Sequence, residues 1–223
     1  MTSADPLPPH HPITIAHSAG NDLALLRRAL EADVDMVEAD VWQHRGRLIL
    51  RHDHKLPLLP ILVDQWHVRL DRAHLTLDEL LGILDQRVRL FLDIKSAEWS
   101  AAQAVLEALS RHRAEASTEL CFKHWGVLTA LREARPGLTL FHSVSNRWRL
   151  RAFLRLLDGP AGPVALSARH SLLDEGLVGR LKERGVRTYA WIVRRRRRAE
   201  ELLRWGVQGI TSDDLDLLAA LRS

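Results

Sequence analysis

The segments Glu38-Ala39-Asp40 and Arg51-His52-Asp53 place three acids and an imidazole within a stretch of sixteen residues. Glu38 and Asp40 lie in the otherwise apolar run Met36–Val41, where a strand's period of two would direct both carboxylates to one face. Burying two like charges side by side is costly unless a cation or a basic group compensates them. Because carboxylate oxygens are the ligands that Mg²⁺ and Ca²⁺ prefer, the pair predicts a cation site.

The composition is that of a globular chain with a sizeable core. With 223 residues and 46% hydrophobic side chains, one domain is expected over residues 13–223, after a polar segment 1–12 that we expect to be disordered or extended. This N-terminal segment lacks the apolar core of a signal peptide, and no apolar run approaches the length of a bilayer span, so we expect a cytoplasmic protein. The single cysteine, Cys121, excludes an intramolecular disulfide and a thiolate metal cluster.

The charge balance is basic, with 32 Lys and Arg against 28 Asp and Glu, and much of the excess lies in the run Arg194, Arg195, Arg196, Arg197 and Arg198. Such a run can be a solvated helix start, or it can collect phosphate groups or an anionic membrane surface. A nucleic acid partner is not expected, because the aromatic residues of a base-stacking platform are missing around the run.

Short β-type runs alternate with amphipathic helical segments, which predicts parallel strands with helical crossovers. The expected strands are Thr14–His17, Met36–Val41, Leu48–Arg51, Arg89–Ile94, Glu119–Lys123, Thr139–Val144, Val164–Ala168, Arg187–Val193 and Gly209–Thr211. The expected helices are Asp22–Ala32, Leu77–Asp85, Ala101–His112, Gly126–Arg135, Asn146–Leu157, Ser171–Arg184 and Arg198–Trp205. Several of these helices end near a glycine placed just before the next strand, as at Gly137, Gly185 and Gly206.

Eight strands remain when Leu48–Arg51 is read as a hairpin return after the second strand. Eight is the number that closes a (β/α)₈ TIM barrel, so the sequence predicts this α/β fold as a single domain. An open, doubly wound sheet is the alternative. It is disfavoured because Gly20 stands alone after the first strand, where a glycine-rich phosphate loop would be expected.

Polar and ionisable residues gather where the expected strands end, and in this fold the chemistry lies at those carboxyl ends. They are His17, Glu38 with Asp40, His52 with Asp53, Asp93 with Lys95, Lys123 with His124, His142, Arg169, Trp191, and Ser212 with Asp213. The arginine run begins three residues after Trp191, which would place it on the same face.

These residues, in this order, resemble the glycerophosphodiester phosphodiesterase family. The family has a His ending strand one, Glu-Asn-Thr opening the first helix, Gly-Ala-Asp before Glu-x-Asp-Val, then His-Asp and Glu-x-Lys. The corresponding residues here are His17, Asn21-Asp22-Leu23-Ala24, Asp35, Glu38-Ala39-Asp40-Val41, His52-Asp53 and Asp93-Ile94-Lys95. Towards the C-terminus, Ala190-Trp191-Ile192-Val193 and Gly206–Asp213 are similar to the family's last two strands, so the resemblance covers roughly residues 13 to 215.

Three departures from the family pattern stand out. The family's Arg-Gly after the first His is absent, Gly20 takes the place of a glutamate that would be a further metal ligand, and the third motif has Asp93 instead of Glu. A short first loop and an Asp-x-Lys motif are similar to the related sphingomyelinase D and phospholipase D barrels. The segment between Asp53 and Leu77 is too short for the inserted subdomain of bacterial glycerophosphodiesterases.

Glu38, Asp40 and Asp93 supply three hard oxygen ligands, which suits a divalent cation, Mg²⁺ more than Ca²⁺ and zinc least. His17 and His52 are then expected as proton carriers, one acting as general base or nucleophile and the other protonating the leaving oxygen. Lys95 would stabilise phosphoryl charge. In addition, Asp53 would orient His52, Trp191 would form a wall of the substrate pocket, and Lys123 and His142 are substrate candidates by position alone.

The sequence thus predicts a metal-dependent phosphodiesterase that hydrolyses glycerophosphodiesters to glycerol phosphate and an alcohol. Two alternatives stay open. One is a phospholipase D- or sphingomyelinase D-like enzyme acting on a lipid phosphodiester, and the other is a non-catalytic barrel that binds phosphorylated metabolites or anionic lipid.

Overall fold

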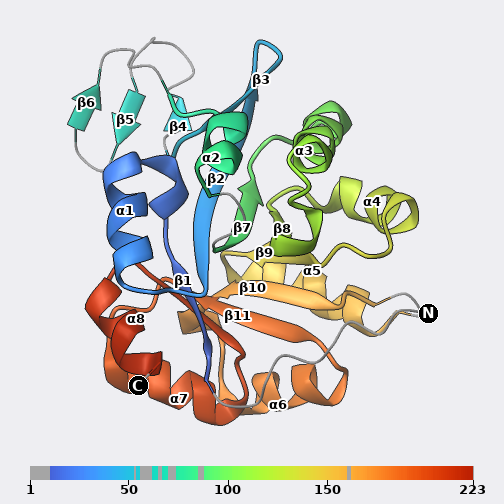
Figure 1. The fold of residues 1–223 in the computed structure, drawn as a ribbon. Helices are drawn as coiled ribbons and strands as arrows, with labels where there is room; N and C mark the ends of the chain where they lie inside the picture. Colours follow the sequence, from blue (N-terminus) through green and yellow to red (C-terminus); the bar gives the residue numbers. More distant parts are fainter. Residues whose placement is uncertain are drawn as a thin grey trace.

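The computed structural model describes residues 11–52, 54–55, 62–64, 67–69, 74–84, 88–159 and 162–222. Eight parallel strands form a closed sheet in the order β1-β2-β7-β8-β9-β10-β11-β12, with β12 pairing back to β1 (Figure 1). The strands are β1 (Ile13–Ala16), β2 (Met36–His44), β7 (Arg89–Ile94), β8 (Thr118–Phe122), β9 (Leu140–Val144), β10 (Ala165–Arg169), β11 (Arg187–Trp191) and β12 (Gly209–Ser212). The predicted TIM barrel is therefore confirmed.

One further strand, β3 (Arg47–Leu50), pairs antiparallel with the end of β2, as the sequence predicts. The pairing of β2 with β7 stops at Val41, so the hairpin extends β2 beyond the barrel at its carboxyl end. Three short strands, β4 (His54–Lys55), β5 (Leu62–Asp64) and β6 (His67–Arg69), form a separate small sheet that the sequence does not predict (Figure 1). They lie between Asp53 and Leu77, the segment that is too short for the inserted subdomain of bacterial glycerophosphodiesterases.

A helix follows each barrel strand before the next one begins, although the hairpin and the small sheet come between β2 and its helix. The helices are α1 (Leu23–Glu31), α2 (Leu77–Leu84), α3 (Trp99–Arg111), α4 (Leu128–Ala134), α5 (Arg147–Leu157), α6 (Glu175–Glu183), α7 (Arg196–Trp205) and α8 (Leu215–Arg222). The last of these is not among the helix ranges expected from the sequence, and α6 begins four residues later than expected. The 3₁₀ turns η1 (Ala19–Asn21) and η3 (Trp125–Val127) precede α1 and α4.

The start of α1 is fixed locally, because the Asp22 carboxylate accepts hydrogen bonds from the backbone of Ala24 and Leu25 at 2.8 and 3.0 Å. Such a cap satisfies amide groups that have no partner within the first turn of a helix. The C-terminal end of another helix, α7, is fixed by Gly206, whose φ of 109° is a left-handed conformation that glycine adopts without strain.

Side chains at alternate strand positions fill the inside of the barrel in layers. The middle layer is an apolar cluster made of Ile13, Ile15, Met36, Phe91, Cys121, Phe141, Ala165 and Tyr189. Below it, at the amino-terminal end of the strands, the buried Glu119 accepts hydrogen bonds from Arg89 at 2.7 Å and from Arg187 at 2.8 Å. This ion-paired layer closes the lower end of the barrel, so the open end is the carboxyl one.

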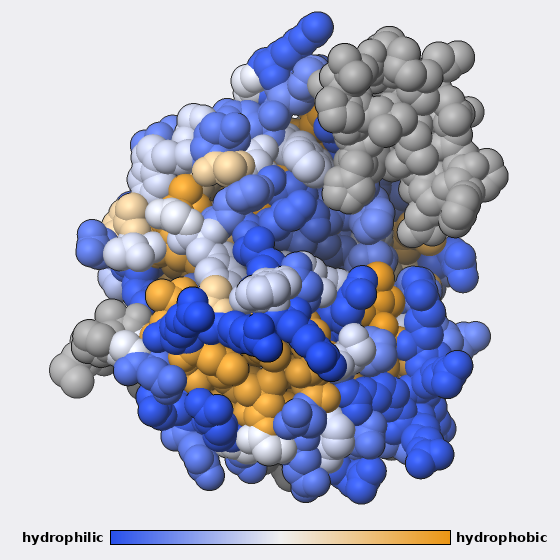
Figure 2. Space-filling view, turned by 180° about the vertical axis from the view of Figure 1, so that it is seen from behind, coloured by the Kyte–Doolittle hydropathy of each residue, from blue (hydrophilic) through white to orange (hydrophobic). Residues whose placement is uncertain are grey.

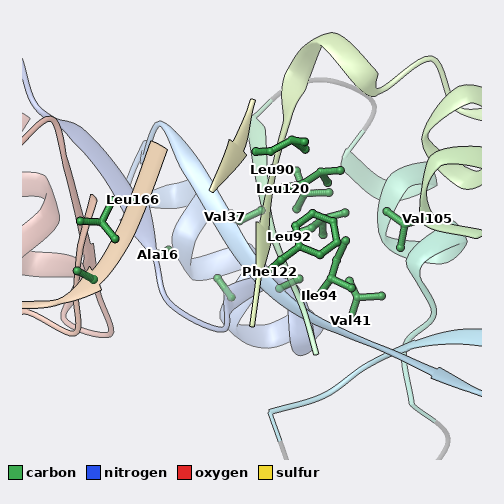
Figure 3. Close-up of a cluster of buried hydrophobic side chains, with 14 of the residues drawn as sticks. Ala16, Val37, Val41, Leu90, Leu92, Ile94, Val105, Leu120, Phe122 and Leu166 are labelled. Atoms are coloured by element: carbon green, nitrogen blue, oxygen red, sulfur yellow. The ribbon is translucent and has the colours of Figure 1, made fainter. Parts of the chain in front are cut away.

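The residues that alternate with this interior point outward and pack against the helices. Figure 3 shows part of this layer, with outward side chains of three neighbouring strands on the side of α3. The labelled residues there include Val37 and Val41 of β2, Leu90, Leu92 and Ile94 of β7, Leu120 and Phe122 of β8, and Val105 of α3. The barrel is therefore held between two apolar layers, one inside it and one under the helices.

Hydrophilic side chains cover most of the face in Figure 2, around a compact hydrophobic area in its lower half. Trp148 on α5 is the most exposed large apolar side chain of the described residues, with 77% of its surface accessible. None of the described helices combines the length and apolar character that crossing a bilayer requires.

Gly209 provides a test of the interior packing. A Cβ added there would lie 2.5 Å from Cδ1 of Tyr189, whose ring packs 4.5 Å from that of Phe141 between centroids. We therefore expect Gly209→Ala to lower the free energy of unfolding by about 1–3 kcal/mol, measured by urea denaturation. The matched control is Gly82→Ala in α2, where a Cβ meets open space; alanine should there stabilise the helix by about 0.5–1 kcal/mol. A Gly209→Ala variant as stable as the parent would contradict this packing.

Candidate active site at the carboxyl ends of the strands

A cavity of about 240 Å³ opens among residues at the carboxyl ends of the barrel strands. It is lined by His17, Glu38, Asp40, Trp42, His52, Phe91, Asp93, Lys95, Lys123, Ser143, Ser145, Arg149, Ser167, Trp191, Ile192 and Thr211. Eight of the nine site residues predicted from the sequence are among them, and the ninth, His142, is not.

The three predicted metal ligands lie together. Asp40 on β2 stands opposite Asp93 on β7 in the register of the two strands, and Glu38 lies two residues before Asp40 on the same face. One carboxylate oxygen of each of the three lies within 4.8 Å of those of the other two. Glu38 and Asp40 are buried, so the expected arrangement of two like charges side by side is confirmed and a third is added.

Lys95 compensates part of this charge. Its Nζ lies 2.6 Å from Oδ1 of Asp40 and also contacts Oδ2 of Asp93, which is two residues earlier on the same strand face. Burial disfavours the ammonium, but the three nearby carboxylates outweigh that effect and raise the pKa of Lys95. The lysine is therefore charged at neutral pH, and one positive charge faces three acids.

The acids themselves show that this compensation is incomplete. Burial, and next to it the Asp40 carboxylate, raise the pKa of Glu38 well above its usual range. Burial also raises the pKa of Asp93, although Lys95 works in the opposite direction. Oδ1 of Asp93 is buried and has no hydrogen-bond partner among the described residues. A cation among these oxygens would supply both the missing charge and the missing partner, so the three acids fit a divalent metal ion.

Backbone and amide groups of the first loop orient two of the three acids. The Ser18 amide donates to Oε2 of Glu38 at 2.6 Å. Asn21 makes two bonds with Asp40: its Nδ2 donates to Oδ2 at 2.8 Å, and its Oδ1 accepts from the Asp40 amide at 2.9 Å. The sequence places Asn21 in a family motif but assigns it no role, and here it fixes the direction of a predicted metal ligand.

Gly20 permits this arrangement because it lies directly against β2. A Cβ at position 20 would be 2.7 Å from Cβ of Ala39 and 3.2 Å from the carbonyl oxygen of Glu38. Ser18, with φ 55°, turns the chain from β1 into η1 and brings Gly20 into this contact. The glutamate that the family resemblance leads one to expect at this position has no room for its side chain, and the three acids are the ligands that the fold provides.

The two predicted proton carriers meet at one side of the acids. His17 follows β1 and His52 follows β3, and their ring centroids are 5.3 Å apart in an edge-to-face arrangement of 82°. Burial lowers the pKa of His17 to about 4, although Asp40 opposes the shift. His17 is therefore neutral at pH 7. Asp53, expected to orient His52, lies outside the described residues.

The opposite wall combines predicted and unpredicted residues. Trp191 at the end of β11 and Lys123 after β8 line the cavity, as expected. Arg149 on α5 also lines it and was not predicted, because it lies beyond the end of β9 at the third position of a helix. Ser143 and Ser145 could have been found, since they continue the period of two that begins at Phe141 inside the barrel.

His142 lies on the other face of β9 and is only 4% exposed. Its ring packs against Trp125 and Phe153, with centroids 5.2 and 5.5 Å away, in the layer between barrel and helices. Burial lowers the pKa of His142 to about 4, so the imidazole is neutral there. The structure therefore separates His142 from the cavity by the parity of one strand position.

The arginine run is largely occupied with partners of its own. Arg194 binds Asp213 through Nε at 2.9 and 3.0 Å and through Nη2 at 2.7 Å. Arg196 pairs with Glu200, and Arg198 pairs with Glu201 and stacks 4.8 Å from the ring centroid of Trp205. The run thus starts α7 and links it to the end of β12, and three of its five charges are balanced by acids of this chain.

Fold and site together define a phosphodiesterase-type (β/α)₈ barrel, with acids, a lysine and two histidines at the strand ends. The sequence profile of the glycerophosphoryl diester phosphodiesterase family matches residues 84–217, more than half of the chain. The chain therefore belongs to this family of phosphoric diester hydrolases. No curated protein matches it.

Solved structures with the same fold cover nearly the whole chain. A Silicibacter pomeroyi protein assigned as a glycerophosphoryl diester phosphodiesterase is 21% identical over 96% of this chain and 94% of its own, with a TM-score of 0.76. The Thermotoga maritima glycerophosphodiester phosphodiesterase is also 21% identical, over 96% and 99%, with a TM-score of 0.71. An Oleispira antarctica phosphodiesterase, solved with its product sn-glycerol-3-phosphate, is 21% identical over 96% and 98%, with a TM-score of 0.71.

Replacing Asn21 tests whether the first loop supports the acid cluster. Asn21→Ala removes both hydrogen bonds to Asp40, so we expect the free energy of unfolding to fall by about 1–3 kcal/mol. The affinity for Mg²⁺, measured by calorimetric titration, should fall about tenfold to a hundredfold. The matched control is Asn146→Ala, which removes the N-cap of α5. It should lower the free energy of unfolding by about 0.5–2 kcal/mol and leave the affinity for Mg²⁺ unchanged. Equal Mg²⁺ affinities of the two variants would rule out this role of Asn21.

His142 leads to a prediction about acid stability. The folded pKa of about 4 lies below the usual 6.5, so the unfolded chain binds the proton first and stability is lost as pH falls from 6.5 towards 4. One such histidine contributes up to about 1.4 kcal/mol per pH unit in this window. We expect His142→Phe to reduce the slope of unfolding free energy against pH by this amount. His124→Phe, at an exposed position, is the control, and an unchanged slope in His142→Phe would contradict the assignment.

Proposed function

We propose that this chain is a divalent-cation-dependent phosphodiesterase that hydrolyses glycerophosphodiesters to glycerol phosphate and an alcohol. The observation that carries the proposal is the meeting of two histidines, three carboxylates and Lys95 on one cavity, in a member of a phosphodiesterase family. The product seen in the Oleispira antarctica relative, sn-glycerol-3-phosphate, supports the same substrate class for this chain.

Glu38, Asp40 and Asp93 would hold the cation. Mg²⁺ suits the site better than Ca²⁺, because three carboxylates leave several positions for water and substrate oxygens. The buried, unpartnered Oδ1 of Asp93 supports this assignment. When bound, the ion would neutralise charge on the non-bridging oxygens of the phosphodiester.

Lys95 places a fixed positive charge beside the acids, within reach of a phosphoryl oxygen. Its ammonium is already oriented by Asp40 and Asp93, so it needs no rearrangement when charge grows on the phosphoryl group. We assign to it the stabilisation of that charge.

We assign the role of general base to His17, which burial keeps neutral at pH 7. It takes the proton of the attacking hydroxyl, whose oxygen forms a new bond to phosphorus. The bond from phosphorus to the leaving oxygen breaks, and His52 donates a proton to that oxygen. The attacking hydroxyl is that of water or one of the substrate's own, and the latter gives a cyclic phosphate that a second hydrolysis opens.

Trp191 and Lys123 are assigned to substrate binding from the wall of the cavity. We leave His142 out of the site because it packs on the outer face of β9. We also do not extend the proposal to a membrane surface, since acids of the chain pair with three arginines of the run.

The proposal is tested by turnover of glycerophosphoglycerol and of bis-(p-nitrophenyl) phosphate, with Mg²⁺ and with EDTA. We expect release of glycerol phosphate that EDTA abolishes. His17→Ala and His52→Ala should each lower kcat about 10²- to 10⁴-fold, the usual contribution of a positioned acid or base. The matched control His124→Ala, an exposed residue outside the cavity, should keep full activity.

No EDTA-sensitive turnover of either compound would refute the proposed function, and full activity of either histidine variant would refute its assigned role. Lysophosphatidylcholine is included as a third compound. If it alone is cleaved, the lipid phosphodiesterase alternative replaces the present one.

A further inference from the structure

Lys123 and Arg149 form a basic pair on the cavity wall away from the histidines, and Asp93 acts on both at a longer range than an ion pair. Both line the cavity, and neither makes an ion pair within the part of the chain that the structure describes. The direct contacts of the cavity acids are with other groups: Asp40 and Asp93 contact Lys95, and Glu38 accepts from the Ser18 amide.

Arg149 is held in a fixed position. Its Nε donates to the Ser143 carbonyl oxygen at 3.1 Å, its Nη2 donates to the Lys123 carbonyl oxygen, and its Cζ lies 4.7 Å from the ring centroid of Trp125. Nη1 makes no hydrogen bond to any described residue. A guanidinium that is oriented in advance loses little conformational entropy when it binds an anion through a remaining N–H group.

The environment of Arg149 disfavours its charge. The side chain is half-buried, and burial lowers its pKa from the usual value. The Asp93 carboxylate opposes this effect but makes no ion pair with Arg149. A partly desolvated cation without an ion pair costs free energy, and main-chain carbonyls and an aromatic face compensate it only in part. An anionic group of a ligand would complete the compensation.

The position of the pair distinguishes it from the acid cluster. In the sheet order, β8 is next to β7 and β9 follows, whereas the histidines follow β1 and β3 on the far side of β2. Lys123 follows β8, the strand next to β7, which carries Asp93, so the basic pair lies on the side of the acids away from the histidines. A phosphodiester seated at the acids and Lys95 therefore directs one substituent towards the histidines and can direct the other towards Lys123 and Arg149.

We propose that Lys123 and Arg149 bind a second anionic group, so that the preferred substrate is a glycerophosphodiester whose alcohol carries a phosphate or a carboxylate. This inference rests on the proposed function and names the substrate class for it. The hydroxyls of Ser143 and Ser145 line the same wall and can donate to such a group. A choline ammonium in this place would meet two like charges, so glycerophosphocholine should be a poor substrate.

The test compares two diesters that differ by one phosphate group, glycerophosphoglycerol and glycerophosphoglycerol phosphate, in the presence of Mg²⁺. We expect kcat/KM of the parent enzyme to favour the phosphorylated diester about tenfold to a hundredfold, the effect of a charge-assisted hydrogen bond. Arg149→Gln and Lys123→Gln should each bring the ratio of the two kcat/KM values close to one. Arg147→Gln, an exposed arginine on the same helix outside the cavity, should keep the ratio and the activity of the parent.

Equal kcat/KM values for the two diesters in the parent enzyme, or an unchanged preference in Arg149→Gln, would overturn the inference. If Arg149→Gln unfolds, Lys123→Gln still decides the question, because the Lys123 side chain is exposed. The preference should also fall as salt is raised, since the charges of this wall are partly open to solvent.

Calorimetric titration separates this inference from the proposed function. If neither diester is hydrolysed, the proposed function fails, but the affinities of the two diesters can still be compared. Tighter binding of the phosphorylated diester to the parent and to Arg147→Gln, but not to Arg149→Gln, would then support the anion site. Equal affinities would refute it.

Discussion

Negative charge concentrated at the neighbouring ends of β2 and β7 is the constraint on which the rest of the site depends. Three carboxylates meet in a buried place, and each group around them supplies positive charge or a donated hydrogen: the Lys95 ammonium, the Ser18 amide and the Asn21 side chain. The left-handed turn at Ser18 and the short η1 helix carry the last two donors into position. The first loop is therefore shaped by electrostatic need as much as by packing.

The barrel meets this constraint by dividing each strand between two tasks. Alternate residues of one strand run from the ion-paired lower layer through the apolar middle layer to the polar upper one, as Arg89, Phe91 and Asp93 do on β7. The apolar middle layer separates the ion pairs around Glu119 from the acids of the site, so the two groups of charges lie at opposite ends of the barrel. The candidate site thus lies at the carboxyl ends of the strands and the ion pairs around Glu119 at the amino ends.

Much of the site could be predicted because strand parity and strand ends are visible in a sequence. Glu38, Asp40, Asp93 and Lys95 obey a period of two, and their meeting follows from two strands being neighbours. His142 precedes Ser143 by one residue and therefore lies on the opposite face of β9. Until the inner and outer faces of this strand are assigned, its position alone cannot exclude it from the site. Arg149 reaches the cavity from α5, which depends on how that helix returns over β9. The strands β4 to β6 are too short to show any alternation.

The contact between Gly20 and Ala39 makes the number of metal-ligating side chains depend on how closely η1 packs against β2. Two positions nineteen residues apart are coupled, because β2 must lose the methyl group of Ala39, or η1 must move away, before position 20 can carry any side chain. Gly20 in the loop and the small Ala39 on the strand depend on each other, so changing either one first costs stability. At position 20, a fourth carboxylate therefore cannot be gained by a single substitution without such a shift. The spacing between η1 and β2 thus limits the number of carboxylates at this end of the barrel as firmly as the strand register does.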